Sequence, residues 1–419
     1  MNLIKLSSFL FSLFAFVFFQ AGYAQQRPEK LRINPDAAMG GTVSQYIDQV
    51  QYITFENSPQ STFSEIDQLE VTDKYYIIWD RATASVLIFD KQGGLHAKIE
   101  PKKLDPQHPN VDGFVFDKQK KLIRVKYYFD RSFFQSYFFD LDGKLITKQK
   151  DSILQSLGLK ISLGGNFQAI SNYWPTFSHP KGDTIAYELM VREEGKLKQK
   201  YLPYHMNVKY NDFKVSQYYK YFSADPVTAD SIAYYTRAFD YNVYRLTPHT
   251  FQAAYRFIFP LQLSLPPNFR DDTVFNDKRV KFIELNKRTI YMVDVFLKSG
   301  NNLFFTPCIN DIFSTLSYIY NRQSQHLVCI NKIVSDAGSY FLPITDAEVG
   351  GTDFVFHGCL RFDGESFYTS YSSPLFFHQM EATKDKHPQY PPSLIKFFSD
   401  KKNLRGNPVL VQIKFKPQL

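Results

Sequence analysis

The chain has 419 residues, with 49 Lys and Arg against 41 Asp and Glu, for a formal net charge of +8. The basic residues are spread out, with no block of five or more. This argues against nucleic-acid binding, because that function needs clustered basic side chains on one element. Aromatic residues make up 17% of the chain, which favours β structure.

The first 24 residues have the three parts of a cleavable signal peptide. Lys5 supplies the positive charge, an apolar run extends from Phe9 to Phe19, and small residues precede a cleavage point after Ala24. That run is too short to span the ~30 Å hydrocarbon core of a bilayer, and no later stretch reaches the ~18 apolar residues of a spanning helix. We therefore expect a soluble mature chain, residues 25–419, in the periplasm or outside the cell.

Two segments near the start of this mature chain repeat each other at one spacing. The matches are Asp80-Arg81 with Asp130-Arg131, Phe89-Asp90 with Phe139-Asp140, and Gly93 with Gly143. The first segment reads as four short strands, 65–71, 75–80, 85–90 and 95–99, and its last turn has the Asp-x-x-Gly pattern of a hairpin. Four antiparallel strands in about 40 to 50 residues are typical of a β-propeller blade.

The whole mature chain divides into six such units. Their approximate bounds are 60–100, 110–150, 165–203, 214–260, 280–334 and 352–416, the last with an insertion rich in Lys and Pro at 383–392. No sustained helical periodicity is present, apart from one short helix at 151–158. We predict an all-β fold, a single six-bladed β-propeller of four-stranded antiparallel blades. A strand from Val43–Phe55 pairs with one at Asn407–Lys416 to close the ring and remove an exposed edge.

A family resemblance rests on segments spread over nearly the whole mature chain. They are Val43–Ile53, Tyr76–Asp80, Leu87–Asp90, Ile309–Asp311 and Asn407–Val411. In these the chain resembles six-bladed β-propeller proteins exported by Bacteroidota, a family largely without assigned function. Residues Trp174–Tyr187 also resemble one blade repeat of the periplasmic TolB-type propellers. Both resemblances imply the same architecture.

The three cysteines, Cys308, Cys329 and Cys359, are an odd number, so at least one has no partner in an oxidising compartment. On the outer strands of a three-stranded meander, Cys308 and Cys329 lie about 9.6 Å apart, beyond the ~7 Å limit for a disulfide. We expect all three to be small buried thiols. Neither they nor the nine histidines form a recognisable metal motif, and the sequence predicts no metal or cofactor.

The candidate ligand-binding residues lie in the loops that join the second and third strands of each blade, which open on one end of the central channel. They are Asp80, Arg81, Asp130, Arg131, Trp174, His179, Arg237, Asp240, Asn310 and Asp311. A ring of Asp and Arg can bind a polar ligand by bidentate hydrogen bonds. The alternative is structural: Asp forms turns, and a repeated Asp-Arg pair can be an ion pair between blades.

Aromatic residues near these loops allow stacking on sugar rings, or else simple packing: Tyr173, Trp174, Phe239 and Tyr241. No nucleophile elbow, zinc-protease motif or phosphate loop is present. We therefore expect a monomeric, non-catalytic binding or scaffolding module that recognises a glycan, a peptide or a partner protein. The alternative is a propeller hydrolase or lyase that uses channel-lining His, Asp and Arg, with His179, His205 and His249 as candidates and a divalent metal as a possible aid.

Overall fold

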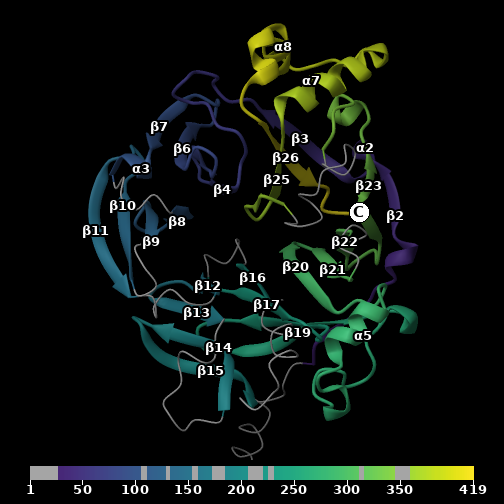
Figure 1. Cartoon of the computed structure of the whole chain (residues 1–419). Helices are drawn as coiled ribbons and strands as arrows, with labels where there is room; N and C mark the ends of the chain where they lie inside the picture. Colours follow the sequence, from purple (N-terminus) through teal and green to yellow (C-terminus); the bar gives the residue numbers. More distant parts are fainter. Residues whose placement is uncertain are drawn as a thin grey trace, which may run out of the picture.

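The computed structural model describes residues 27–104, 111–128, 133–152, 159–171, 185–205, 220–224, 231–310, 316–344 and 359–419. Six sheets, each of four or five strands, stand side by side in a ring (Figure 1). The predicted six-bladed β-propeller is therefore confirmed. The signal peptide and residues 153–158 of the expected short helix lie outside the described residues.

The first three blades each contain four antiparallel strands. Blade 1 holds β4 (Gln68–Val71), β5 (Tyr75–Asp80), β6 (Ser85–Asp90) and β7 (Leu95–Ile99). Blade 2 holds β8 (Val111–Asp117), β9 (Leu122–Tyr128), β10 (Phe133–Phe139) and β11 (Leu145–Ser152). Blade 3 holds β12 (Leu159–Ser162), β13 (Phe167–Ser171), β14 (Ile185–Glu193) and β15 (Lys196–His205).

The other three blades each include a strand from the N-terminal region. Blade 4 holds β16 (Lys220–Ala224), β17 (Ala233–Arg237), β18 (Asn242–Leu246), β19 (Phe251–Ile258) and β1 (Glu29–Arg32). Blade 5 holds β20 (Met292–Ser299), β21 (Asn302–Cys308), β22 (Tyr318–Asn321), β23 (Leu327–Val334) and β2 (Met39–Thr42). Blade 6 holds β24 (Arg361–Phe362), β25 (Ser366–Tyr371), β26 (Val409–Phe415) and β3 (Ile47–Ile53).

The order of strands within a blade defines two faces of the ring. The innermost strand of blade 4, β16, contacts those of its neighbours, β12 and β20, and β24 likewise contacts β4. Because successive strands are antiparallel, the loops between second and third strands lie at one end of every blade, here called the upper face. The turns between first and second, and between third and fourth, strands lie at the lower face.

The repeated Asp-x-x-Gly turn behaves as its sequence predicts. The Asp90 carboxylate accepts hydrogen bonds from the N–H groups of Gln92, at 2.8 Å, and Gly94, at 2.9 Å. Asp140 does the same for Asp142, at 3.0 Å, and Lys144, at 2.8 Å. Gly93 and Gly143 have φ of +86° and +76°, a conformation that glycine adopts without steric cost.

Apolar clusters fill the gaps between neighbouring blades. Between blades 1 and 2, for example, Trp79 and Ile88 pack with Ile123 and Phe139. At the closure, Ile53 and Leu410 of blade 6 pack with residues of blade 1. Each such side chain contributes about 1.5–3 kcal/mol when fully buried, and the blades are thereby locked into one ring.

The ring closes where β26 pairs with β3, with Leu410 opposite Ile53. This confirms the predicted pairing of the two chain ends, but the N-terminal partner is shorter than expected. Residues Val43–Tyr46 form one turn of helix, α2, instead of strand. The reason is local, since the Asp336 carboxylate accepts hydrogen bonds from the Ser44 N–H, at 3.1 Å, and the Ser44 hydroxyl, at 2.9 Å.

Residues 29–53 form what we call the N-terminal strap. Strand β1 pairs in parallel with β19 of blade 4, β2 pairs in parallel with β23 of blade 5, and β3 completes blade 6. The strap therefore lies along the outer edge of three consecutive blades. Its last strand, β3, lies within the predicted closing strand, whereas β1 and β2 were not predicted, because Glu29–Arg32 and Met39–Thr42 are four-residue segments without the alternation that identifies strands.

A helical cap (residues 373–405) is inserted between β25 and β26 on the upper face of blade 6. It contains α7 (Ser373–Ala382), α8 (Pro392–Ser399) and two 3-10 turns, Lys384–Lys386 and Lys401–Arg405. Proline near the start of both α-helices suits the first helical turn. Their buried residues, Phe376, Leu394 and Phe397, join the cluster between blades 5 and 6.

The chain also contains short helices outside the helical cap. Short helices also occur at Pro101–Leu104 (α3) and Arg279–Leu285 (α5), so the prediction of a single helix was wrong. None of the helices among the described residues is both long and apolar enough to cross a membrane.

All three cysteines are free thiols, with Cys329 buried and Cys308 and Cys359 half-buried.

Candidate ligand-binding site

The first predicted pair, Asp80 and Arg81, lies at the upper end of β5. Asp80 is fully buried, and its carboxylate accepts hydrogen bonds from the hydroxyls of Ser64, at 2.8 Å, and Thr83, at 2.5 Å. The Arg81 side chain is 68% exposed and lies 3.5 Å from Asp67 of the same blade. Asp80 therefore stabilises its own turn, and the Arg81 ion pair lies within blade 1.

Five of the other eight predicted residues fall where the structure gives no description. Asp130, Arg131, Trp174, His179 and Asp311 lie outside the described residues, as does Tyr173. Asn310 is exposed just beyond the upper end of β21. The other two candidate histidines are His205 and His249. His205 is the last residue of β15. His249 is exposed, and its ring packs edge-on against Phe167 of blade 3, with 5.3 Å between centroids.

Arg237 and Asp240 belong to a four-charge cluster at the upper face between blades 3 and 4. Arg237 Nε lies 2.8 Å from Asp240 Oδ2, and its Nη1 lies 3.3 Å from Glu188 Oε1 on β14. Arg270, from the segment that leads into blade 5, binds the same Glu188 oxygen. Two cations and two anions therefore balance in one partly buried network that joins three chain segments.

The local environment keeps Arg237 and Asp240 charged. Burial alone raises the pKa of Asp240, but Arg237 and hydrogen bonds from Asn242 and Tyr244 hold that pKa below its usual value. Burial likewise lowers the pKa of Arg237, but Glu188 and Asp240 raise it above the ordinary range. Burial and the neighbouring Asp240 raise the pKa of Tyr244 to about 12. Since loss of one partner from a buried pair typically costs about 3–5 kcal/mol, removal of a single charge from this cluster is expected to destabilise the protein.

The nearby aromatic residues pack into the protein as the structural interpretation predicts. Phe239 is buried against Phe269 of the following segment. The Tyr241 hydroxyl donates to the Ile290 carbonyl at 2.5 Å and accepts from the Leu265 N–H at 2.8 Å. Phe239 is therefore buried, while Tyr241 is half-buried and its ring packs edge-on against Phe259.

One carboxyl group on the channel side has a strongly raised pKa. Asp294 lies on the innermost strand of blade 5, and burial raises its pKa to about 6, against a hydrogen bond from the Val295 N–H that lowers it. Val295 has φ of +47°, an uncommon conformation for a β-branched residue. The strand shifts register at this bulge. This group can change charge near neutral pH.

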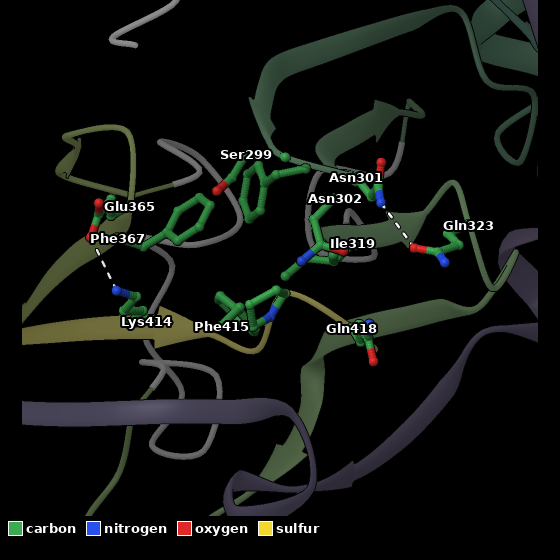
Figure 2. Close-up of a pocket in the computed structure, with 13 residues that line it drawn as sticks. Ser299, Asn301, Asn302, Ile319, Gln323, Glu365, Phe367, Lys414, Phe415 and Gln418 are labelled. Carbon is green, nitrogen blue, oxygen red and sulfur yellow. Dashed lines mark hydrogen bonds and ion pairs between the residues drawn. The ribbon is translucent and has the colours of Figure 1, made fainter.

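The lower face holds a pocket of about 360 Å³ between blades 5 and 6 (Figure 2). We call it the interblade pocket. Its floor is apolar and buried: Phe304 and Ile319 from blade 5, Phe367 and Phe415 from blade 6. The rings of Phe304 and Phe367 lie with centroids 5.0 Å apart across the blade boundary. The floor is thus part of the packed interface, and its shape is fixed by both blades.

Polar groups from opposite blades form the walls of this pocket (Figure 2). On the blade 5 side, the Asn301 amide donates to Gln323 Oε1 at 3.1 Å. On the blade 6 side, Lys414 Nζ lies 3.0 Å from Glu365 Oε2. Ser299 and Gln418 also line the pocket. The walls therefore offer amide and hydroxyl groups, together with an ion pair whose charges cancel.

The β20–β21 turn that carries Asn301 has a defined geometry. Gly300, the first of its two central residues, has φ of +57°, as the type II′ hairpin turn requires. Behind it, Asn302 is buried, donates to the Lys416 carbonyl at 2.9 Å and accepts from Asn321 at 2.7 Å. These bonds attach the pocket wall to the C-terminal strand and hold Asn301 at the rim.

Sequence reasoning missed the interblade pocket because it draws on three distant chain segments, residues 299–323, 365–367 and 414–418. The only local signal is the turn sequence Ser-Gly-Asn-Asn, which predicts a hairpin and says nothing about a cleft. A second cavity of about 400 Å³ lies between blades 4 and 5, lined mainly by apolar residues such as Leu263, Ile290 and Leu316. The last of these borders residues 311–315, which the structure does not describe.

The family of this chain follows from a comparison with known families. The domain of unknown function DUF4934 matches residues 32–414, so the chain belongs to that family. No protein of curated function matches the sequence.

Solved structures are similar to this chain at low sequence identity. A putative exported protein from Bacteroides fragilis is similar with a TM-score of 0.60 at 11% identity, over 92% of this chain and 99% of that one. A DUF4221 family member from Bacteroides vulgatus has a TM-score of 0.38 at 11% identity, over 88% of this chain and 98% of that one. TolB from Acinetobacter baumannii has a TM-score of 0.29 at 11% identity, over 64% of this chain and 54% of that one.

The first of these similarities supports the propeller fold alone. Within the described residues, no group of three or more His, Cys, Asp or Glu is placed to hold a metal ion. The hydrolase or lyase alternative stays a prediction.

Proposed function

We propose that this protein is a non-catalytic binding module whose interblade pocket takes a small, uncharged polar group of a larger ligand, such as a terminal sugar residue of a glycan or a segment of a peptide. The observation that carries the proposal is the pocket itself. It has an apolar floor and polar walls supplied by two blades, the combination typical of ligand sites.

The size and charge of the pocket narrow the ligand class. A volume of about 360 Å³ is near the lower end of the range for small-molecule sites, enough for one or two sugar rings. Glu365 and Lys414 neutralise each other, so a ligand that carries a net charge gains little. The amides of Asn301, Gln323 and Gln418 both donate and accept hydrogen bonds, which suits hydroxyl and peptide groups.

The proposal moves recognition from the upper face, where the sequence predicted it, to the lower face. What supports the move is that the described polar groups of blades 1 and 4 on the upper face are used by their own turns and ion pairs. We further propose that the chain acts as an exported monomer with residues 1–24 removed, which mass spectrometry of the secreted protein tests.

The test is binding, measured by calorimetry after a thermal-shift screen with neutral oligosaccharides and uncharged peptides. Asn301→Trp places an indole at the pocket rim, at a turn position without the positive φ that disfavours large side chains, and we expect affinity to fall at least about tenfold. Since the pocket holds no unbalanced charge, affinity is expected to change little with ionic strength.

The matched control is Gln92→Trp, the same type of change in an exposed lower-face turn of blade 1. It is expected to bind like the unmodified chain. Equal loss in both variants, or a ligand whose affinity depends steeply on salt, would contradict recognition of a neutral group in this pocket.

A further inference from the structure

In Figure 1, helices α7 and α8 of the helical cap lie outside the ring of blades, next to β3, β25 and β26 of blade 6. The helical cap is anchored from below, because Leu394 and Phe397 are buried in the cluster between blades 5 and 6. A 37-residue excursion is not needed to join two antiparallel strands, which two residues can connect. The outward side of α8 and of the following 3-10 turn is therefore free to serve another purpose.

This outward side carries an unbalanced positive charge. Four basic side chains in residues 392–405 are exposed: Lys396, Lys401, Lys402 and Arg405. Asp400 is the one acidic residue in that stretch, and its carboxylate accepts the Lys402 N–H at 2.9 Å as a cap. In contrast, Lys384 of the same cap lies 3.4 Å from Glu381.

Two large aliphatic side chains are exposed among these cations. Ile395 is 57% exposed on α8, and Leu404 is 42% exposed on the 3-10 turn. Both lie next to or within one turn of a basic residue. The surface thus combines apolar groups that can insert with cations that can bind anions.

We propose that this cationic-aliphatic face of the helical cap contacts an anionic lipid surface. Protein interfaces are enriched in aromatic residues and Arg and depleted in Lys, whereas three of these four cations are Lys and the exposed apolar residues are aliphatic. Segments that combine Lys and Arg with apolar side chains are typical of helices that lie in the headgroup region. Each cation contributes roughly fivefold to membrane partitioning, so the contact is reversible.

The experiment uses residues 25–419, because the apolar segment before them would itself partition into vesicles. Co-sedimentation is measured with phosphatidylcholine vesicles and with vesicles that contain roughly one third phosphatidylglycerol. We expect binding to the anionic vesicles only, and loss of binding when salt rises from about 0.1 M to about 1 M and the Debye length falls from about 10 Å to about 3 Å. The triple variant Lys396→Glu/Lys401→Glu/Lys402→Glu is expected to lose at least about a hundredfold in partitioning.

The matched control reverses three exposed lysines of blade 2, in the variant Lys118→Glu/Lys120→Glu/Lys148→Glu, with the same change in net charge. It is expected to retain most of the binding. A second variant, Ile395→Ser/Leu404→Ser, keeps every charge and is expected to weaken binding to the anionic vesicles at about 0.1 M salt, because it removes the apolar groups that insert. Thermal unfolding confirms that each variant is folded. Equal loss of binding in both charge variants overturns the proposal. Absence of sedimentation with either type of vesicle also overturns it, and an acidic protein is then the expected partner of this face.

Discussion

The outer edges of blades 1–3 and of blades 4–6 are protected in different ways. In blades 4 and 5 the N-terminal strap adds a fifth, parallel strand, and in blade 6 it supplies the fourth. In blades 1–3 the outermost strands, β7, β11 and β15, have no further strand beside them among the described residues. An open edge is a risk for aggregation, so the second group needs another defence.

That defence is in the side chains of the open edges. Strand β11 carries Lys148 and Lys150, and β15 carries Lys196, Lys198 and Lys200 together with Pro203. Charged residues and Pro on an edge strand disfavour pairing with another chain. The strap instead satisfies the backbone directly and brings apolar residues such as Leu31 onto the ring. Covered edges thus contribute to stability, and charged edges contribute to solubility.

The largest expected effect is on stability, and it distinguishes the covered edges of blades 4–6 from the charged edges of blades 1–3. Leu31→Ala on β1 removes a side chain that is 2% exposed and packs in the cluster between blades 4 and 5. We expect the free energy of unfolding to fall by about 2–5 kcal/mol, measured by urea denaturation. The matched change Leu197→Ala on β15, where the side chain is 45% exposed, is expected to stay within about 0.5 kcal/mol of the unmodified chain. Similar losses in the two variants would erase the distinction.

An intermediate effect tests how closely the strap approaches the ring. A Cβ at Gly40 of β2 would lie 2.6 Å from the Lys332 carbonyl oxygen of β23, so Gly40→Ala forces the two strands apart. We expect a loss of about 1–3 kcal/mol in urea denaturation. At the open edge, Gly195 has φ of +78° with open space around it, so Gly195→Ala costs only backbone strain, about 1 kcal/mol. A smaller loss at Gly40 than at Gly195 argues against close contact.

The smallest effect concerns pH. Partial burial raises the pKa of Asp336, but hydrogen bonds from Thr42, Ser44 and Gly338 outweigh it, and the pKa is lower in the folded state. A lowered pKa adds stability above the unfolded value of about 3.9, and this stability is lost as pH falls through the folded value. Asp336→Asn is therefore expected to melt lower than the unmodified chain at pH 7 and to lose less on acidification. Parallel melting curves against pH would contradict a role for this carboxylate in holding α2.

The sequence was informative wherever the fold repeats local chemistry. The Asp90 and Asp140 turns, the strand alternation of blade 1 and the C-terminal strand all depend on residues close together in the chain, and each was predicted. Strand β2 of the strap was missed because Met39-Gly-Gly-Thr42 has no strand pattern, and only its distant partner β23 makes it a strand. Helices α7 and α8 were missed because each is short and its apolar residues serve the blade 5–6 cluster.

The candidate site shows the same limit. Arg237 and Asp240 were selected by loop position and do lie together, but Glu188 and Arg270, which complete their network, come from other segments. The interblade pocket depends on how β20, β25 and the C-terminal residues meet after the ring has closed. No pattern among neighbouring residues of the sequence predicts that these three segments lie together.

The closure between β3 and β26 has a consequence for how this protein is made. The Asn407 amide donates to the Glu56 carbonyl across 351 positions of the chain, so the seal cannot form until synthesis is almost complete. Closing so large a loop adds little thermodynamic cost, because the entropy of closure grows only with the logarithm of length. The long separation does affect the folding rate, because pairing between distant segments is slow. Until β26 has been synthesised, β3 has no partner in blade 6 and the ring of blades stays open. A chaperone can bind the chain in this open state.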